Sequence, residues 1–168
     1  EVSEQQATAL LTQLSIGELV SLQGINSGIE NTNYFLTTDQ GEYVLTLFER
    51  LNHEQLPFYL YLMKHLASRG VAVPDPQSNR HGDILLTLLD KPAAVVNRLP
   101  GACLEEPSTV HCAAMGQTLA QMHLAAKDYD RQQINLRGLA WADQVGAQQH
   151  RDKGDHDEVI VFKCAGRW

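Results

Sequence analysis

The chain has 168 residues, of which 43% are hydrophobic and 20% are charged, so it is long enough for one domain with a buried core. Its formal net charge of −7, without any cluster of Lys or Arg, argues against a surface for nucleic acid or anionic membranes. No apolar run approaches the about 20 residues of a membrane span, and the first residues lack the basic and apolar regions of a signal peptide. We therefore expect a cytoplasmic protein whose partner is a small molecule.

The first 50 residues predict one helix followed by three strands. Residues 3–6 have the form of a capping box, and apolar residues at helical spacing extend the predicted helix to about Ser15. Runs rich in β-branched and aromatic residues at 18–22, 34–38 and 43–48 predict strands. Turn residues separate these runs, so residues 18–49 form a predicted antiparallel meander.

The next 50 residues predict a crossover helix and two more strands. Pro57 lies in the first turn of the helix, where proline is tolerated, and Gly70 follows the last apolar position. Residues 83–88 and 93–98 have strand composition and flank a turn at 90–92. The predicted sheet therefore has five strands and one crossover helix.

A second helical region begins at Ser108, which is a favourable N-cap. Apolar residues then recur at spacings of three and four, as expected of a helix that faces a core. This stripe consists of Cys112, Met115, Leu119, Met122 and Ala126.

The turn between the first two predicted strands is rich in glycine and asparagine over residues 24–33. Glycine permits a positive φ and lets backbone N–H groups approach a ligand closely, as binding a polyphosphate requires. Asparagine and glycine also favour any hairpin turn. The loop alone therefore leaves two interpretations open, a phosphate-binding loop and a plain hairpin.

The order of several motifs resembles a known family. Residues 28–35, 43–49, 56–58 and 69–74 resemble segments of the homoserine kinases of the aminoglycoside-phosphotransferase and choline-kinase group. Residues 93–101 resemble the hinge of that family, and residues 111–123 resemble its first large-lobe helix. The resemblance covers about residues 5–145, and ordered motifs are more specific than any single one.

This resemblance implies an α+β fold in three parts. Residues 1–99 would form a kinase-like nucleotide-binding small lobe, with a five-stranded antiparallel sheet and one crossover helix. Residues 100–147 would form the hinge and the first helices of an incomplete helical large lobe, and residues 148–168 a divergent tail. The implied reaction is ATP-dependent phosphorylation of the side-chain hydroxyl of L-homoserine, a step toward threonine.

The resemblance also implies the residues that bind ATP. A phosphate-binding lysine of related kinases is replaced on the third strand by Thr46, for which strand propensity is the competing interpretation. Mg²⁺ is implied as well, with ligands outside this chain. The implied ATP-binding residues are Gly24, Asn26, Ser27, Gly28, Asn31 and Asn33 in the phosphate loop, Thr46 on the third strand, and Asn97, Arg98 and Leu99 in the hinge.

We predict no catalytic or metal-binding residue in the chain. The sequence of residues 81–83, His-Gly-Asp, has the form of the catalytic loop of the family, but it precedes the hinge and has Leu88 where an asparagine is needed, so we interpret it as a turn. The polar cluster at 150–157 and the three cysteines have no metal-site spacing, and we interpret Cys112 as a core residue. We therefore expect the chain to stop before the catalytic loop and to be inactive alone.

Two alternatives remain open. The chain is either a homoserine kinase by descent or a non-catalytic nucleotide-binding or interaction module that reuses the small lobe. Within the enzyme class, kinases for another small alcohol, such as choline or an aminoglycoside, are a further alternative, because the acceptor residues of the family lie mainly in the large lobe. We also expect the uncovered helix after Ser108 to favour self-association.

Overall fold

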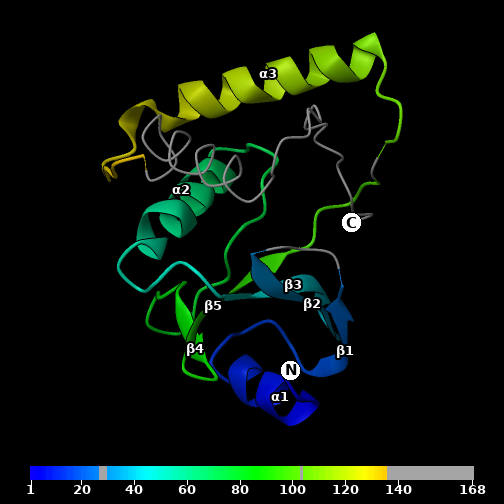
Figure 1. Cartoon of the computed structure of the whole chain (residues 1–168), viewed down its shortest axis with the longest axis vertical. Coiled ribbons are helices and arrows are strands. Elements are labelled where there is room, and N and C mark those ends of the chain that lie inside the picture. The colour runs from blue at the N-terminus through cyan, green and yellow to red at the C-terminus, as the bar shows by residue number, and fades with distance from the viewer. Residues whose placement is uncertain (27–29, 103, 136–168) are drawn as a thin grey trace, which may run out of the picture. The chain divides into compact units, whose positions relative to one another are not determined.

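The structure, a computed structural model, describes residues 1–26, 30–102 and 104–135. Nearly all of them belong to one compact unit, Glu1–Asp130, and residues 131–135 belong to a second. Among the described residues, no helix combines the length and apolar character needed to cross a membrane. The elements (Figure 1) are α1 (Glu4–Leu11), β1 (Leu19–Ile25), β2 (Asn31–Thr38), β3 (Gly41–Phe48), α2 (Leu56–Ser68), β4 (Leu86–Leu88), β5 (Lys91–Asn97), α3 (Thr109–Ala125) and the 3₁₀ helix η1 (Ala126–Asp128).

The five strands form one antiparallel sheet in the order β1-β2-β3-β5-β4. This confirms the predicted five-stranded sheet, with α2 as the crossover between β3 and β4 (Figure 1). Strand β4 has three residues, whereas the prediction gave six. The difference arises because Asp83 closes a turn with Asn79, and Ile84 then packs in a separate cluster with α2.

Helix α1 begins where the sequence predicts. Ser3 N–H donates to Gln6 Oε1 at 2.8 Å, and Gln6 N–H donates to Ser3 Oγ at 3.3 Å, which completes the capping box. The helix ends at Leu11, earlier than predicted, because the last turn tightens and Leu14 forms a bridge to Asn79. The residues between α1 and β1 therefore do not continue the helix, and one of them, Leu14, pairs with Asn79 instead.

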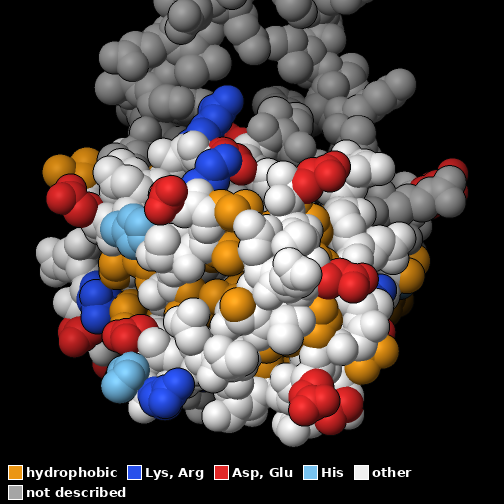
Figure 2. Space-filling model, turned by 90° about the horizontal axis from the view of Figure 1, so that it is seen from below, with side chains coloured by type: hydrophobic (Ala, Val, Ile, Leu, Met, Phe, Trp, Pro, Cys, Tyr) orange, Lys and Arg blue, Asp and Glu red, His pale blue; other side chains and the backbone are white. Residues whose placement is uncertain are grey.

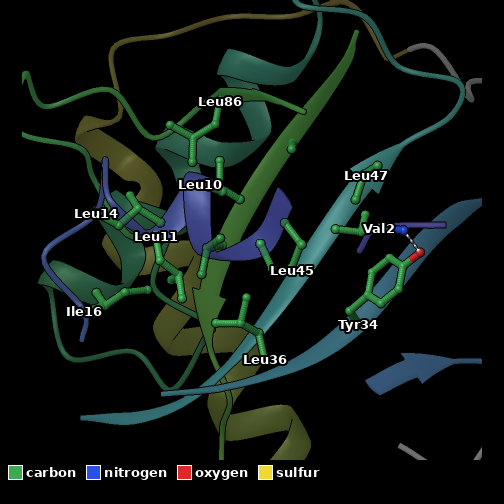
Figure 3. Packing of buried hydrophobic residues seen from close by; sticks show 13 residues of the cluster. Val2, Leu10, Leu11, Leu14, Ile16, Tyr34, Leu36, Leu45, Leu47 and Leu86 are labelled. Carbon is green, nitrogen blue, oxygen red and sulfur yellow. Dashed lines mark hydrogen bonds between the residues drawn. The ribbon is translucent and has the colours of Figure 1, made fainter. Parts of the chain in front are cut away.

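The larger hydrophobic cluster lies between α1 and one face of the sheet, which we call the α1 face (Figure 3). Leu36 and Leu45 from the middle strands are fully buried, and Leu10 points toward them from the helix. Each fully buried leucine contributes about 1.5–3 kcal/mol relative to an exposed one. At the margin of the cluster, Val2 N–H donates to the Tyr34 hydroxyl at 2.8 Å and ties the N-terminus to β2.

The smaller cluster lies on the opposite face of the sheet, which we call the second face. Side chains alternate between the faces of a strand, so Ala94 points away from its neighbours Ala93 and Val95 in the larger cluster. Ala94 packs with Leu56 and Leu60 of α2. The crossover helix therefore covers part of the second face.

Helix α3 carries no buried residue. Its N-cap is as predicted, since Ser108 N–H donates to His111 Nδ1 at 3.0 Å. Three members of the stripe that the sequence assigns to a core, Cys112, Met115 and Leu119, are exposed in the described chain, with Met115 61% and Leu119 46% exposed, whereas Met122 and Ala126 are half-buried. The prediction that Cys112 is a core residue is wrong for this structure, because the thiol is exposed on the same uncovered helix.

The face of the molecule in Figure 2 carries hydrophobic side chains among the backbone and the other uncharged side chains. Acidic, basic and histidine side chains are interspersed around them rather than gathered by sign.

Candidate functional site

Two rows of side chains cross the second face of the sheet. The strand register aligns Ile25, Asn33, Thr46 and Ala94 in the first row. Because Tyr34, Leu36 and Leu45 are buried on the α1 face, their alternate neighbours belong to the second face. The same register aligns the second row, which consists of Gln23, Phe35, Val44 and Val96.

The centre of the first row is a side-chain hydrogen bond. Thr46 Oγ1 donates to Asn33 Oδ1 at 2.8 Å, and both groups are partly buried. The bond occupies the oxygen of the asparagine amide, so the end of Asn33 that can donate to an anion is its nitrogen. The uncharged pair of Thr46 and Asn33 therefore occupies the strand position where the resemblance implies a lysine in related kinases.

Three of the six residues predicted for the phosphate loop lie in strands. Gly24 lies inside β1, and Asn31 and Asn33 lie inside β2, whereas Asn26 directly follows β1. The placement of Gly24 in the turn is wrong, because this residue pairs with Tyr34 in the ladder and its φ lies outside the left-handed region. A Cβ at this position would be in ordinary van der Waals contact with the Tyr34 ring, at 3.9 Å. The other two loop residues of the prediction, Ser27 and Gly28, lie outside the described residues.

Charged side chains lie where β2 begins and β3 ends. Glu49 accepts from the Thr32 hydroxyl at 2.8 Å and from Lys91 Nζ at 2.5 Å. These two hydrogen bonds, first from Lys91 and then from Thr32, hold the pKa of the Glu49 carboxyl below its ordinary value. Arg50 forms a longer ion pair with Glu30, at 3.6 Å. This end of the hairpin therefore carries both signs of charge.

The first two Lys or Arg side chains after β3, Arg50 and Lys64, are paired with other groups. Lys64 Nζ lies 2.9 Å from Asp75 Oδ1 and donates to the Pro76 carbonyl at 3.0 Å, and Arg50 pairs with Glu30. Neither contact involves Thr46. In the part of the chain that the structure describes, Thr46 therefore has an amide partner rather than a cationic one.

The predicted hinge lies at the end of β5. Arg98 N–H donates to the Glu42 carbonyl at 2.9 Å, and Asn97 N–H donates to the Asp75 carbonyl at 3.3 Å. Two of the three hinge N–H groups are therefore used inside the chain. The guanidinium of Arg98 lies 4.4 Å from the centre of the Phe35 ring, a cation–π contact on the second face.

Phe35 is a candidate site residue that the sequence analysis missed. It lies in the second row, between Gln23 and Val44, and it carries the Arg98 contact. The alternation of β2 could have identified it, because Phe35 is two residues from Asn33 and shares its face.

Residues 80–82 form a turn, as interpreted from the sequence. Asn79 Oδ1 accepts from the N–H groups of His81 at 2.8 Å and Asp83 at 2.9 Å, and Gly82 has a φ of 87°. The Asn79 amide also donates to the Asp83 carboxylate at 3.1 Å. Among the described residues, no group of three or more His, Cys, Asp or Glu side chains is arranged to hold a metal ion. The polar cluster at 150–157 lies outside the described residues.

The five-stranded antiparallel sheet with its crossover helix is the small lobe of a kinase-like phosphotransferase. The fold is similar to that of a spectinomycin phosphotransferase solved with ADP and spectinomycin, with a TM-score of 0.64 at 15% identity over 92% of this chain and 49% of that one. It is also similar to an amicoumacin kinase solved with AMP-PNP and Ca²⁺, with a TM-score of 0.63 at 16% identity over 90% of this chain and 52% of that one.

The sequence model of the phosphotransferase enzyme family matches residues 21–164, and the chain belongs to this family. The chain is 60% identical to a homoserine kinase of Polaromonas naphthalenivorans (strain CJ2) over 141 residues, which are 84% of this chain and 45% of the relative. It is 53% identical to a homoserine kinase of Cupriavidus necator over 170 residues, covering 99% of this chain and 48% of the relative. These matches confirm the resemblance to homoserine kinases. The chain spans about half the length of these curated relatives.

Proposed function

We propose that this chain is the nucleotide-binding part of a homoserine kinase, which transfers the γ-phosphoryl group of ATP to the side-chain hydroxyl of L-homoserine. The observation that carries the proposal is the 60% identity to a homoserine kinase over 84% of the chain. The assignment of L-homoserine as the acceptor alcohol is inferred from these relatives alone. The assignment of ATP as the nucleotide is inferred from these relatives and also from the two rows of side chains on the second face.

ATP binds on the second face in this proposal. The apolar side chains of Phe35, Val44 and Val96 form a surface for the adenine ring, and Leu99 offers main-chain groups to its edge, beside Asn97 and Arg98. The polyphosphate lies toward Asn33 and Thr46. Neutral amides and backbone N–H groups bind oxyanions there, with contributions from the remaining loop residues Gly24, Asn26, Ser27, Gly28 and Asn31.

Magnesium does not fit the described residues alone. Mg²⁺ prefers carboxylate and water oxygens in octahedral geometry, whereas the first row offers one amide and one hydroxyl. The carboxylates nearest the hairpin, Glu30 and Glu49, are engaged with Arg50 and Lys91. In this proposal the metal ligands and the catalytic base belong to the half of the relatives that this chain does not span, and the chain alone does not turn over ATP.

Calorimetry with ATP tests the nucleotide site directly. We expect the chain to bind ATP, and Asn33→Asp to weaken binding at least about tenfold, because a carboxylate would face the phosphates. Gln5→Ala, on the exposed side of α1, is the matched control and should bind like the unchanged chain. Equal affinity in Asn33→Asp and Gln5→Ala would contradict the placement of the polyphosphate.

Turnover is a separate test. We expect a coupled ADP-release assay with L-homoserine to give no signal for the 168-residue chain. Turnover that disappears in Asp83→Ala would overturn both this expectation and the interpretation of residues 81–83 as a turn. If the chain binds no nucleotide, the alternative of an interaction module gains support. Turnover by a chain extended to the length of the relatives, with choline or an aminoglycoside in place of homoserine, would favour another small-alcohol kinase.

Self-association is proposed through α3. Its uncovered side includes Met115 and Leu119, and contiguous exposed apolar side chains favour association. Sedimentation should show a concentration-dependent dimer or larger species, which Met115→Lys reduces and Gln117→Lys, on the same helix, leaves unchanged. A monomer at all concentrations would contradict the proposal.

A further inference from the structure

A charged cluster joins the end of α2 to the segment after α3. The Asp128 carboxylate accepts from the Arg69 guanidinium, and its Oδ1 lies 3.3 Å from His65 Nε2. The same His65 nitrogen donates to the Ala125 carbonyl at 2.9 Å. Asp128 therefore receives contacts from two residues of the α2 region, at the point where the chain leaves α3.

Tyr129 extends this cluster to the beginning of α2. Its hydroxyl donates to the Phe58 carbonyl at 2.7 Å. Its ring lies 5.7 Å from the Phe58 ring in an edge arrangement and 5.2 Å from the His65 ring. Phe58, His65 and Arg69 are separated by seven and four residues, so they form one stripe along the helix. The segment Asp128–Tyr129 therefore contacts α2 over most of its length.

The other side of α2 is joined to the second face of the sheet. Leu56 and Leu60 pack against Ala94, which neighbours Thr46 in the first row. Lys64 pairs with Asp75, and Asp75 N–H donates to Asn97 Oδ1 in the hinge. Contacts of α2 therefore lead to the proposed phosphate row and, through Asp75, to the proposed hinge.

We infer that Asp128 and Tyr129 are positioning residues that hold α2 in place over the second face, and that losing their contacts weakens the binding of an adenine nucleotide that neither residue touches. This inference rests on the proposed function for its ligand. The contacts of Asp128 and Tyr129 with α2 do not depend on the proposed function. An exposed ion pair contributes little by itself, so the carboxylate, the hydroxyl and the ring together hold α2, through contacts along the same helix stripe.

The pKa of Asp128 agrees with a carboxylate that is ionised in the cluster. Desolvation raises this pKa, but the hydrogen bond from Arg69 and the charges of Arg69 and His65 outweigh it, and the pKa is lowered from its ordinary value. The carboxylate is therefore charged at neutral pH, where it accepts from Arg69.

Hydrogen exchange on the nucleotide-free chain tests the positioning contacts. We expect Asp128→Asn, which keeps the shape and removes the charge, to speed amide exchange over residues 65–71 about tenfold. Tyr129→Phe should speed exchange near the first turn of α2. Asp130→Asn is the matched control, two residues further along the chain, and should leave exchange unchanged. Unchanged exchange in Asp128→Asn and Tyr129→Phe would overturn the inference.

Calorimetry with ATP tests the consequence. We expect Asp128→Asn to weaken ATP binding about three- to tenfold, and the double variant Arg69→Gln with Asp128→Asn to be no weaker than the worse single variant, because both changes break the same pair. Additive losses would overturn a shared positioning role. If the unchanged chain binds ATP and Asp128→Asn binds it equally well, this inference fails while the proposed function stands. If no form binds ATP, the proposed function fails, and the linkage of α2 to nucleotide binding fails with it.

Discussion

The two faces of the sheet are built from alternate residues of the same strands but differ in chemistry. On the α1 face, Leu36 and Leu45 are fully buried beneath a helix with a capping box (Figure 3). On the second face, the alternate positions carry Asn33, Phe35 and Thr46, which are only partly buried. The difference indicates that the α1 face supplies most of the stability of the fold. The second face can carry polar groups because it does not have to supply that stability.

The largest expected effect breaks the α1 face. Leu36→Ala removes a fully buried side chain from the larger cluster and should reduce the free energy of unfolding by about 2–5 kcal/mol. Denaturant unfolding measures this loss. Val20→Ala, at a position that is 65% exposed, is the control and should change the free energy by no more than about 0.5 kcal/mol. Equal losses in the two variants would contradict the assignment of stability to this face.

A smaller effect is expected on the second face. Thr46→Val keeps the shape of the side chain and removes its hydrogen bond to Asn33, which should reduce the free energy of unfolding by about 0.5–1.5 kcal/mol. ATP affinity should fall in the same variant, because the hydroxyl is lost and Asn33 is no longer oriented. A stability loss as large as that of Leu36→Ala, or an unchanged ATP affinity, would remove the contrast between the faces.

The smallest effect concerns the pH dependence at the margin of the sheet. The folded pKa of Glu49 is lowered, so its contribution to stability is present above the ordinary glutamate pKa of about 4.3 and is lost as the pH falls through the folded pKa. The melting temperature should therefore fall less in acid for Glu49→Gln than for the unchanged chain. Glu18→Gln, at an exposed position, should retain the full acid dependence. Identical acid profiles for Glu49→Gln and the unchanged chain would contradict this role.

The sequence was sufficient for the features that depend on neighbours in the chain. The capping box at Ser3 and the strand-like run at 43–48 are both local patterns, and the structure agrees with them. The order of the strand-like runs also predicted the five-stranded sheet, because each run is bounded by turn residues.

Features that depend on pairing across the chain were not predictable in the same way. Asn31 and Asn33 have turn composition, yet the ladder with β3 extends β2 through them, since each finds a partner in Phe48 and Thr46. Likewise, the helical spacing around Cys112 predicts an apolar stripe, but spacing does not say whether another segment covers it. The contacts of Asp128 join residues about 60 positions apart and leave no periodic signal.

Strand β5 has small residues at two successive positions, Ala93 and Ala94, and both are almost completely buried. Ala93 belongs to the larger hydrophobic cluster and Ala94 to the smaller one, so two adjacent residues of one strand pack in two different cores. A larger side chain at either position would push the same backbone toward the opposite core. Evolutionary changes of volume in one core of this lobe are therefore constrained by the packing of the other.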